Sequence, residues 1–379
     1  MLYYLSLLEG HLSEFRLFQY ITFRTLGAAA TAFIISLLLA PGLIKKLRII
    51  NFGDLVEDER VGALDKSKKV GTPTMGGLLI ILSATAATLL WAIPTNIYML
   101  IALGTFILMG AIGFADDYLK IKRRTGLSMK MKFAAQLVWS VIVFGVLWSI
   151  PETRERLTDF MVPFLKNPLF QMTLIPAFLF LVIVLVGASN AVNLTDGLDG
   201  LAIGCSNSVA AAYLLLTYVA GHYAFAEYLQ VPFVKGSGEL SVFCGSLLGA
   251  GLGFLWYNCH PAKIFMGDTG SLALGGAIAM LAILIKQELL LIIVGGVFVL
   301  EAASVVLQSS WFKYTRKKYG EGQRVFKCAP LHHHFEFVEK ERALEQNRAP
   351  ELVETVIVTR FWILSIIFAL IGIATLKLR

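Results

Sequence analysis

Ten stretches of mostly apolar residues run along this chain, and they limit strongly what it can fold into. A bilayer core about 30 Å thick needs about 20 apolar residues in a helix, and each stretch is close to that length. The stretches cover residues 20–42, 74–94, 97–115, 133–150, 172–188, 199–220, 240–257, 270–285, 289–310 and 358–376. Only 16% of the 379 residues are charged, against about 25% in soluble domains. The sequence therefore predicts an all-α, polytopic integral membrane protein with about ten transmembrane helices.

The chain shows no internal repeat and no low-complexity segment, so we expect one integral membrane domain over residues 1–379. Residues 1–20 lack a basic start followed by an apolar run, which argues against a cleavable signal peptide. The four cysteines have no spacing of zinc or disulfide type.

Lysine and arginine concentrate in the loops on one side of the predicted membrane. These are the loops after the first, third and ninth spans, whereas the opposite loops hold only scattered residues such as Arg154, Arg156 and Lys286. The positive-inside rule makes the basic side cytoplasmic, so both termini are predicted to be external. The net charge of +7 then indicates contact with anionic lipid and a phosphorylated substrate, and not with nucleic acid.

Two adjacent acids stand at the end of the third span, in GFADDYLK. Asp116 and Asp117 lie side by side there, with Lys120 one turn later. Adjacent carboxylates repel unless a divalent cation or a cationic side chain lies between them, and oxygen ligands suit magnesium. The alternative is an ordinary solvated helix end.

A polar stripe enters the sixth span in SNAVNLTDGLDGLA. Asn190, Asn193, Asp196 and Asp199 recur every three residues, and on a helix they would lie roughly along one face. Carboxylates near a span are costly and usually face a cavity or a partner. A helix cap explains Asp196 alone better than it explains the whole stripe.

Another acid, Asp268, precedes the eighth span in MGDTGSLALGG. A helix N-terminus attracts anions, and a carboxylate there is a candidate to hold a magnesium ion that contacts a pyrophosphate. Simple capping of the helix is the alternative.

Three consecutive histidines, His332, His333 and His334, stand in APLHHHFE in the last cytoplasmic loop. Consecutive side chains do not converge on one metal as zinc ligands do. We therefore expect hydrogen bonds to a phosphate or a sugar, with a structural loop as the alternative. In KKVGTPTMGG, Lys69 is placed to approach a phosphate, although the stretch is not a P-loop.

These acids, lysines and histidines all fall on the predicted cytoplasmic side and indicate magnesium-assisted phosphoryl transfer. In that reaction the protein mainly positions groups and stabilises charge. No serine triad is apparent. A secondary transporter also uses intramembrane acids, but it needs a site near the midplane, and here the acids gather at one face.

The motifs KKVGTPTMGG, GFADDYLK, NAVNLTDGLDGLA, MGDTGSLALGG and PLHHHFE, in this order, resemble the phospho-N-acetylmuramoyl-pentapeptide transferase family. This family is a branch of the polyprenyl-phosphate N-acetylhexosamine-1-phosphate transferase superfamily. The resemblance covers essentially the whole chain. The acidic motifs are shared by the superfamily, whereas GTPTMGG and PLHHHFE are typical of this branch.

The resemblance implies a membrane step of bacterial peptidoglycan synthesis. Phospho-MurNAc-pentapeptide would pass from UDP-MurNAc-pentapeptide to undecaprenyl phosphate, giving lipid I and UMP, with Mg²⁺ required. The enzyme would lie in the bacterial cytoplasmic (inner) membrane as a multi-pass protein, with periplasmic termini, a cytoplasmic active site and a homodimeric state. The acceptor tail is too apolar to leave the bilayer and would lie between helices. A sister transferase that uses UDP-GlcNAc shares the acidic motifs and is the main alternative.

The resemblance also implies roles for individual residues. Asp268 would bind magnesium, and Asp116 and Asp117 would act near the lipid phosphate, one of them as a base. Direct attack by the lipid phosphate and a covalent intermediate on an aspartate both stay open. Motif positions assigned to substrate binding are Lys69, Thr74, Lys120, Lys132, Asn190, Asn193, Asp196, Asp199, Asn258, His332, His333 and His334.

Overall fold

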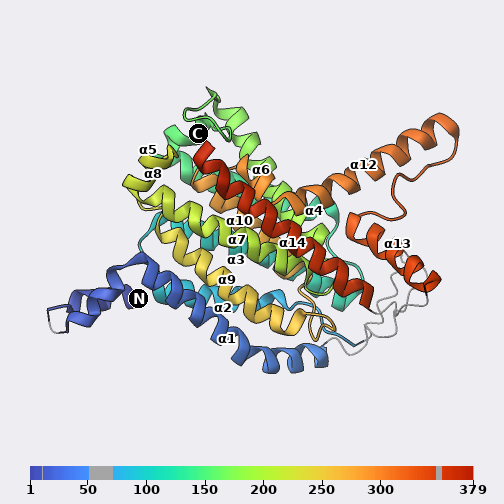
Figure 1. Ribbon diagram of the computed structural model, residues 1–379, viewed down its shortest axis with the longest axis horizontal. Helices are drawn as coiled ribbons and strands as arrows, with labels where there is room; N and C mark the ends of the chain where they lie inside the picture. Colours follow the sequence, from blue (N-terminus) through green and yellow to red (C-terminus); the bar gives the residue numbers. More distant parts are fainter. Residues whose placement is uncertain (11, 51–70, 347–351, 379) are drawn as a thin grey trace.

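The computed structural model describes residues 1–10, 12–50, 71–346 and 352–378, and these ranges are almost entirely helical (Figure 1). The all-α prediction is confirmed. Within the described ranges the strands are limited to β1 (Asp159–Phe160) and β2 (Phe170–Gln171), which pair antiparallel in a short hairpin. The predicted site residue Lys69 lies outside the described residues.

Helices make up most of the described part of the chain. In chain order they are η1 (Leu2–Leu8), η2 (Ser13–Gln19), α1 (Ile21–Ile50), α2 (Gly77–Trp91), α3 (Ile97–Arg123), α4 (Met129–Ser149), α5 (Pro151–Thr158), α6 (Leu174–Thr195), α7 (Leu201–Gly221), α8 (Tyr223–Leu229), α9 (Glu239–Asn258), α10 (Gly267–Leu284), α11 (Leu290–Val294), α12 (Gly296–Tyr319), α13 (Leu331–Glu345), α14 (Val353–Ala374) and η5 (Thr375–Leu378).

All ten predicted stretches coincide with helices, but not all of these helices are equally suited to cross a membrane. In the described part of the chain, eight are long and apolar enough: α1, α3, α4, α6, α7, α9, α10 and α14. Helix α2 has only 15 residues. The ninth predicted span is divided at Gly295 into α11 and α12, and α12 continues into the basic run before Gly320. The exact number of spans stays a prediction.

Helix α10 lies at the centre of the bundle, in contact with α2, α3, α6 and α7. Its first turn is packed by glycine against two neighbours. A Cβ on Gly77 of α2 would lie 2.0 Å from the nitrogen of Gly270, and one on Gly113 of α3 would lie 2.1 Å from the carbonyl oxygen of Asp268. Small residues let helix backbones approach this closely. The first turn of α10 is therefore held by backbone contact with α2 and α3.

The two chain ends lie at the same end of the bundle in Figure 1, and α13 lies at the opposite end. This arrangement agrees with an even number of crossings. The side of the membrane on which the termini lie stays a prediction. Helix α12 leaves the bundle and reaches outward at the α13 end.

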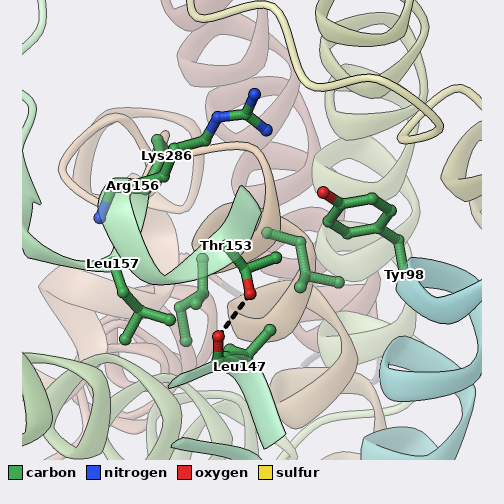
Figure 2. Close-up of a pocket in the computed structure, with 8 residues that line it drawn as sticks. Tyr98, Leu147, Thr153, Arg156, Leu157 and Lys286 are labelled. Atoms are coloured by element: carbon green, nitrogen blue, oxygen red, sulfur yellow. Dashed lines mark hydrogen bonds between the residues drawn. The ribbon is translucent and has the colours of Figure 1, made fainter. Parts of the chain in front are cut away.

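A small pocket at the end that holds the termini is lined by residues of α3, α4, α5 and α10 (Figure 2). It contains two cationic side chains, Arg156 and Lys286, beside Tyr98. The Thr153 hydroxyl donates to the Leu147 carbonyl and ties α5 to α4. Among the described residues no carboxylate lines this pocket, and the acidic motifs of the sequence lie elsewhere, so it is not the candidate site.

Candidate active site

The end of α3 and the start of α10 bring three acids together. Asp116 and Asp117 lie in the last turns of α3, and Asp268 lies in the first turn of α10. One carboxylate oxygen from each lies within 4.8 Å of the other two. Asp116 and Asp117 are buried, at 0% and 4% exposure. The structure thus joins two of the predicted acidic motifs into one cluster.

Two lysines lie between these carboxylates. Lys120 Nζ is 2.6 Å from Asp116 Oδ2 and 3.0 Å from Asp268 Oδ2. Lys132 Nζ is 2.8 Å from the same Asp116 oxygen and 2.5 Å from Asp268 Oδ2. Three carboxylates with two ammonium groups leave a formal charge of −1. The Lys120 side chain is 48% exposed, so the cluster opens to solvent on that side.

The tight connection between α3 and α4 brings Lys132 back over the end of α3. Helix α3 ends at Arg123 and is followed by Arg124 in the left-handed conformation (φ 57), and Ser128 caps α4 by accepting from the Met131 N–H. Within this turn the Leu127 N–H donates to Asp116 Oδ1 at 2.6 Å. The turn therefore fixes Asp116 and aims Lys132 at it.

Asp117 is held by the first turn of α10. Its Oδ2 accepts from the Thr269 N–H at 2.9 Å and from the Thr269 hydroxyl at 2.7 Å. Its Oδ1 accepts from the Asp268 N–H at 3.3 Å. The two adjacent aspartates thus have different partners: lysines for Asp116 and a helix N-terminus for Asp117.

The polar stripe, predicted at the start of the sixth span, lies instead at the end of α6, the helix of the fifth span, and in the loop after it. Its two asparagines have different environments. Asn193 Nδ2 donates to Asp268 Oδ1 at 2.7 Å and to the Ser271 hydroxyl at 2.8 Å. Asn190 instead donates to Gln136 Oε1 at 3.1 Å and to the Val186 carbonyl at 2.8 Å. Asn193 therefore belongs to the acidic cluster, whereas Asn190 joins α6 to α4.

Asp196 follows directly after the last residue of α6. Burial, together with the negative charges of Asp268 and Asp117, raises the pKa of Asp196 to about 7. A backbone hydrogen bond from Gly267 opposes this shift. Asp196 is thus electrostatically part of the same cluster, and it changes charge near neutral pH.

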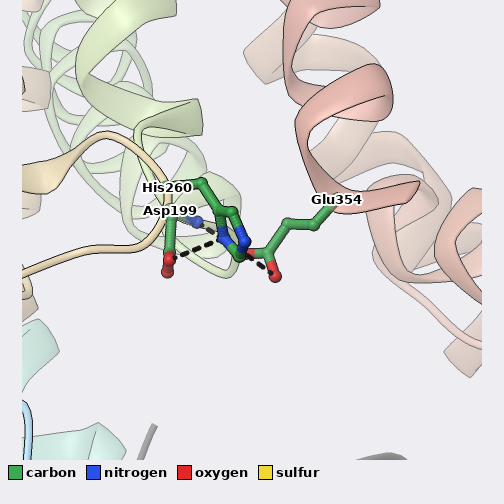
Figure 3. Close-up of side chains that lie close together, drawn as sticks. All are labelled: Asp199, His260 and Glu354. Atoms are coloured by element: carbon green, nitrogen blue, oxygen red, sulfur yellow. Dashed lines mark hydrogen bonds and ion pairs between the residues drawn. The ribbon is translucent and has the colours of Figure 1, made fainter. Parts of the chain in front are cut away.

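A second cluster joins three segments beside the first (Figure 3). His260 lies between Asp199 and Glu354: its Nδ1 is 3.1 Å from Asp199 Oδ2 and 3.8 Å from Glu354 Oε2. The Asp199 N–H donates to Glu354 Oε1 at 2.9 Å. Asn258 supports the same loops, because its Oδ1 accepts from the Gly200 N–H at 3.1 Å and its amide donates to the Ile264 carbonyl.

Sequence reasoning selected Asp199 and Asn258 but missed His260 and Glu354. His260 stands two residues after Asn258, and Glu354 is a lone acid at the start of an apolar helix. Neither has a motif spacing that would connect it to Asp199. Only the fold brings the loop after α9 and the first turn of α14 to the loop after α6.

The three histidines point to three different partners. His332 is buried, and its N–H and Nδ1 lie 3.1 and 3.0 Å from the carboxylate of Glu301 in α12. His333 Nδ1 is 2.9 Å from Glu336 Oε2, and His334 Nδ1 accepts from the Lys327 N–H. They do not converge on one point, as expected for consecutive residues.

His332 joins α13 to the loop that holds Asp196 and Asp199. A Cβ on Gly197 would lie 2.2 Å from its Nε2, so the ring packs directly on the loop between Asp196 and Asp199. Burial lowers the pKa of His332, and the hydrogen bond with Glu301 opposes this shift. Glu301 was not among the predicted residues, although a lone acid inside an apolar stretch was a signal for it.

Thr74 lies beside the acidic cluster, since a Cβ on Gly267 would be 3.1 Å from its hydroxyl oxygen. The backbone of GTPTMGG runs along the segment before α10. The Phe265 N–H donates to the Pro73 carbonyl, and the Gly76 N–H donates to the Phe265 carbonyl, both at 2.8 Å. This motif therefore supports the loop that leads to Asp268.

Comparison with known proteins gives consistent results over the whole length. The sequence profile described as Glycosyl transferase family 4 matches residues 99–286. A phospho-N-acetylmuramoyl-pentapeptide-transferase of Desulfatibacillum aliphaticivorans is 49% identical over 387 residues, which cover all of both chains. Relatives of the same name from Syntrophus aciditrophicus and Methylacidiphilum infernorum are 48% and 46% identical, again over all of both chains.

This chain belongs to the phospho-N-acetylmuramoyl-pentapeptide-transferase family. The resemblance inferred from its motifs is thereby confirmed. The chain is an enzyme of the phosphosugar transferase class and a multi-pass membrane protein. The acidic cluster, with Asp196 and the His260 cluster beside it, is the candidate active site of this transferase.

Proposed function

We propose that this chain transfers phospho-MurNAc-pentapeptide from UDP-MurNAc-pentapeptide to undecaprenyl phosphate, with lipid I and UMP as products, in bacterial peptidoglycan synthesis. The observation that carries the proposal is the cluster of three carboxylates and two lysines at the ends of α3 and α10. Full-length identity of 49% to a transferase of this name supports the choice of donor. An acceptor confined to the bilayer fits a multi-pass enzyme.

The residues present fit a magnesium ion. Carboxylate oxygens are the ligands that Mg²⁺ prefers, together with substrate phosphates. We assign the ion to Asp268, whose second oxygen is already oriented by Asn193. When bound, Mg²⁺ would neutralise charge on the donor pyrophosphate.

The lysines supply the positive charge that a pyrophosphate needs. Lys120 contacts three carboxylates in the structure and Lys132 contacts two, so both ammonium groups are held at the cluster. Once the carboxylates are neutralised, these groups are free to pair with phosphate oxygens. In phosphoryl transfer, such positioning and charge stabilisation are the main contributions of the protein.

The remaining predicted residues are proposed to line the substrate cleft. Asp116 and Asp117 would lie near the acceptor phosphate. The cluster is compatible with direct attack of the lipid phosphate on the donor and with a covalent intermediate on an aspartate. The cleft would be completed by Lys69, Thr74, Asn190, Asn193, Asp196, Asp199, Asn258, His332, His333 and His334. We further propose a single domain over residues 1–379, a homodimer, periplasmic termini and a site that faces the cytoplasm.

The test is UMP release by the purified protein in detergent with undecaprenyl phosphate and Mg²⁺. Wild type should release UMP from UDP-MurNAc-pentapeptide, and Asp268→Asn should not. Release from UDP-GlcNAc alone would replace this proposal with the sister transferase. Release from neither donor would contradict both.

A further inference from the structure

Asp116 and Asp117 are neighbours in sequence but are bound by different parts of the molecule. Asp116 contacts Lys120, Lys132 and the turn after α3. Asp117 receives three hydrogen bonds from two consecutive residues at the start of α10. Their chemical roles therefore need not be the same.

The contacts of Asp117 are those of a helix cap supplied from another helix. The first N–H groups of an α-helix lack partners within the helix, and a carboxylate oxygen placed there accepts from them. The negative charge is also stabilised by the helix dipole. Here the Thr269 hydroxyl is a third donor, and Thr269 is completely buried.

We propose that Asp117 and Thr269 are positioning residues that fix the first turn of α10, so that Asp268 points into the acidic cluster. Asp117 then takes no proton from the substrate. This inference rests on the proposed function for the role of Asp268 as a metal ligand. That Asp117 and Thr269 hold Asp268 in place is a separate claim.

The local backbone supports this role. Gly267 adopts φ +72, a conformation that favours glycine, and a Cβ there would lie 2.7 Å from Asp117 Oδ2. On the other side, Gly113 of α3 lets the Asp268 carbonyl approach. The turn that carries Asp268 is thus held between the α3 backbone and the Asp117 side chain.

The hydrogen bonds that Asp117 already accepts argue against its use as a base. Its Oδ2 already accepts two hydrogen bonds of 2.9 and 2.7 Å, and its Oδ1 accepts a third and lies 3.7 Å from Lys120 Nζ. A base must turn an oxygen toward the proton that it removes. Turning Oδ2 toward such a proton would break both hydrogen bonds from Thr269 and loosen the first turn of α10, which carries Asp268.

The first experiment replaces Thr269 by valine, which keeps the shape and removes the hydroxyl. We expect kcat to fall about tenfold, the loss expected for one hydrogen bond to a charged acceptor. The KM for the donor should stay within about twofold of wild type, and Mn²⁺ binding, measured by electron paramagnetic resonance, should weaken about tenfold. Thr269→Ser keeps the hydroxyl and should restore kcat and Mn²⁺ affinity.

The matched control is Thr88→Val. Thr88 is also completely buried in a helix, and within the described residues its hydroxyl has no hydrogen-bond partner. This variant should bind Mn²⁺ and turn over as wild type does. Hydrogen exchange of the peptide that covers residues 266–271 should be faster in Thr269→Val than in Thr88→Val, because one anchor of that turn is gone.

Asp117→Asn separates positioning from proton transfer. If Asp117 is a positioning residue, this variant should have both a lower kcat and a lower Mn²⁺ affinity. The acid limb of its pH profile of kcat should be that of wild type. The inference is overturned if Thr269→Val matches wild type in Mn²⁺ affinity and exchange while Asp117→Asn loses turnover with unchanged Mn²⁺ affinity. Weaker Mn²⁺ binding by Thr269→Val in a protein that releases no UMP would instead reject the proposed function and keep this inference.

Discussion

Two buried ionic clusters lie at opposite ends of α3, and they are built differently. Near its start, Arg24 makes two bonds of 2.7 and 2.6 Å to Glu239, and Glu239 also accepts from the Ile93 N–H. Near its end, about 20 residues and about 30 Å away, three carboxylates share two lysines. The first cluster is neutral and almost completely buried; the second has surplus negative charge and an exposed side.

The comparison separates a structural ion pair from a site that can take a ligand. A buried pair that is balanced and hydrogen-bonded offers nothing to a substrate, but it joins α1, α2 and α9 because Arg24 also donates to the Trp91 carbonyl. The carboxylate surplus at the other end is costly unless a cation is added. Stability should therefore depend on the first cluster and activity on the second.

The largest expected effect is that of Asp268→Asn on turnover. Removing this carboxylate takes away the proposed metal ligand and a partner of both lysines, so kcat should fall by about a thousandfold or more. UMP release measures it. Asp159→Asn, in the hairpin at the other end, is the matched control and should be fully active. Residual activity of Asp268→Asn above a tenth of wild type would contradict the assignment.

Arg24→Met should have the largest effect on stability. It leaves Glu239 buried without its cation, at a cost of about 3–5 kcal/mol. Unfolding in detergent would show it, while UMP release per folded molecule should stay close to wild type. The double variant Arg24→Met with Glu239→Leu should recover part of the loss. A stable but inactive Arg24→Met would break the proposed division between the two ends.

Lys132→Met should lower activity by a smaller but clear factor. Lys132 is less exposed than Lys120 and lies closer to Asp268, so its loss should reduce kcat/KM for the donor about 10- to 100-fold. Steady-state UMP release over a range of donor concentrations tests it. Lys130→Met removes an exposed lysine of the same turn and should change little. Equal effects of the two variants would show that only the general positive charge of this face matters.

The smallest effect is expected for His260→Ala. His260 joins Asp199 and Glu354 beside the acidic cluster, and the loss of one or two hydrogen bonds should raise the donor KM about 3- to 10-fold. kcat at saturating donor should hardly change. A large fall in kcat with an unchanged KM would place His260 at the reacting atoms and extend the active site to this second cluster.

The fold class and the chemical type of the site were predictable from the sequence. Each apolar stretch became a helix because its length and composition suit a bilayer, whatever its neighbours are. Asp116, Asp117 and Asp268 were selected because acids at helix ends beside membrane spans are costly without a cation. These inferences use only local properties of the chain.

Partners that meet through the fold were not predictable in this way. Asn190 and Asn193 have the same spacing pattern, yet one contacts Gln136 and the other Asp268. Glu301 and His260 had no motif, because their partners come from distant segments of the chain. Lys132 was selected as a substrate contact, and its position between Asp116 and Asp268 depends on the turn after α3.

The sequence by itself determined that this protein is a helical membrane enzyme with acidic motifs at one face. The tertiary structure decided which of these motifs meet. Lys120 and Asp268 are 148 residues apart and lie at 3.0 Å only because glycines let α3 and α10 pack backbone against backbone. Helix formation depends on neighbours along the chain, whereas the contacts between helices depend on how close and in what order the helices pack.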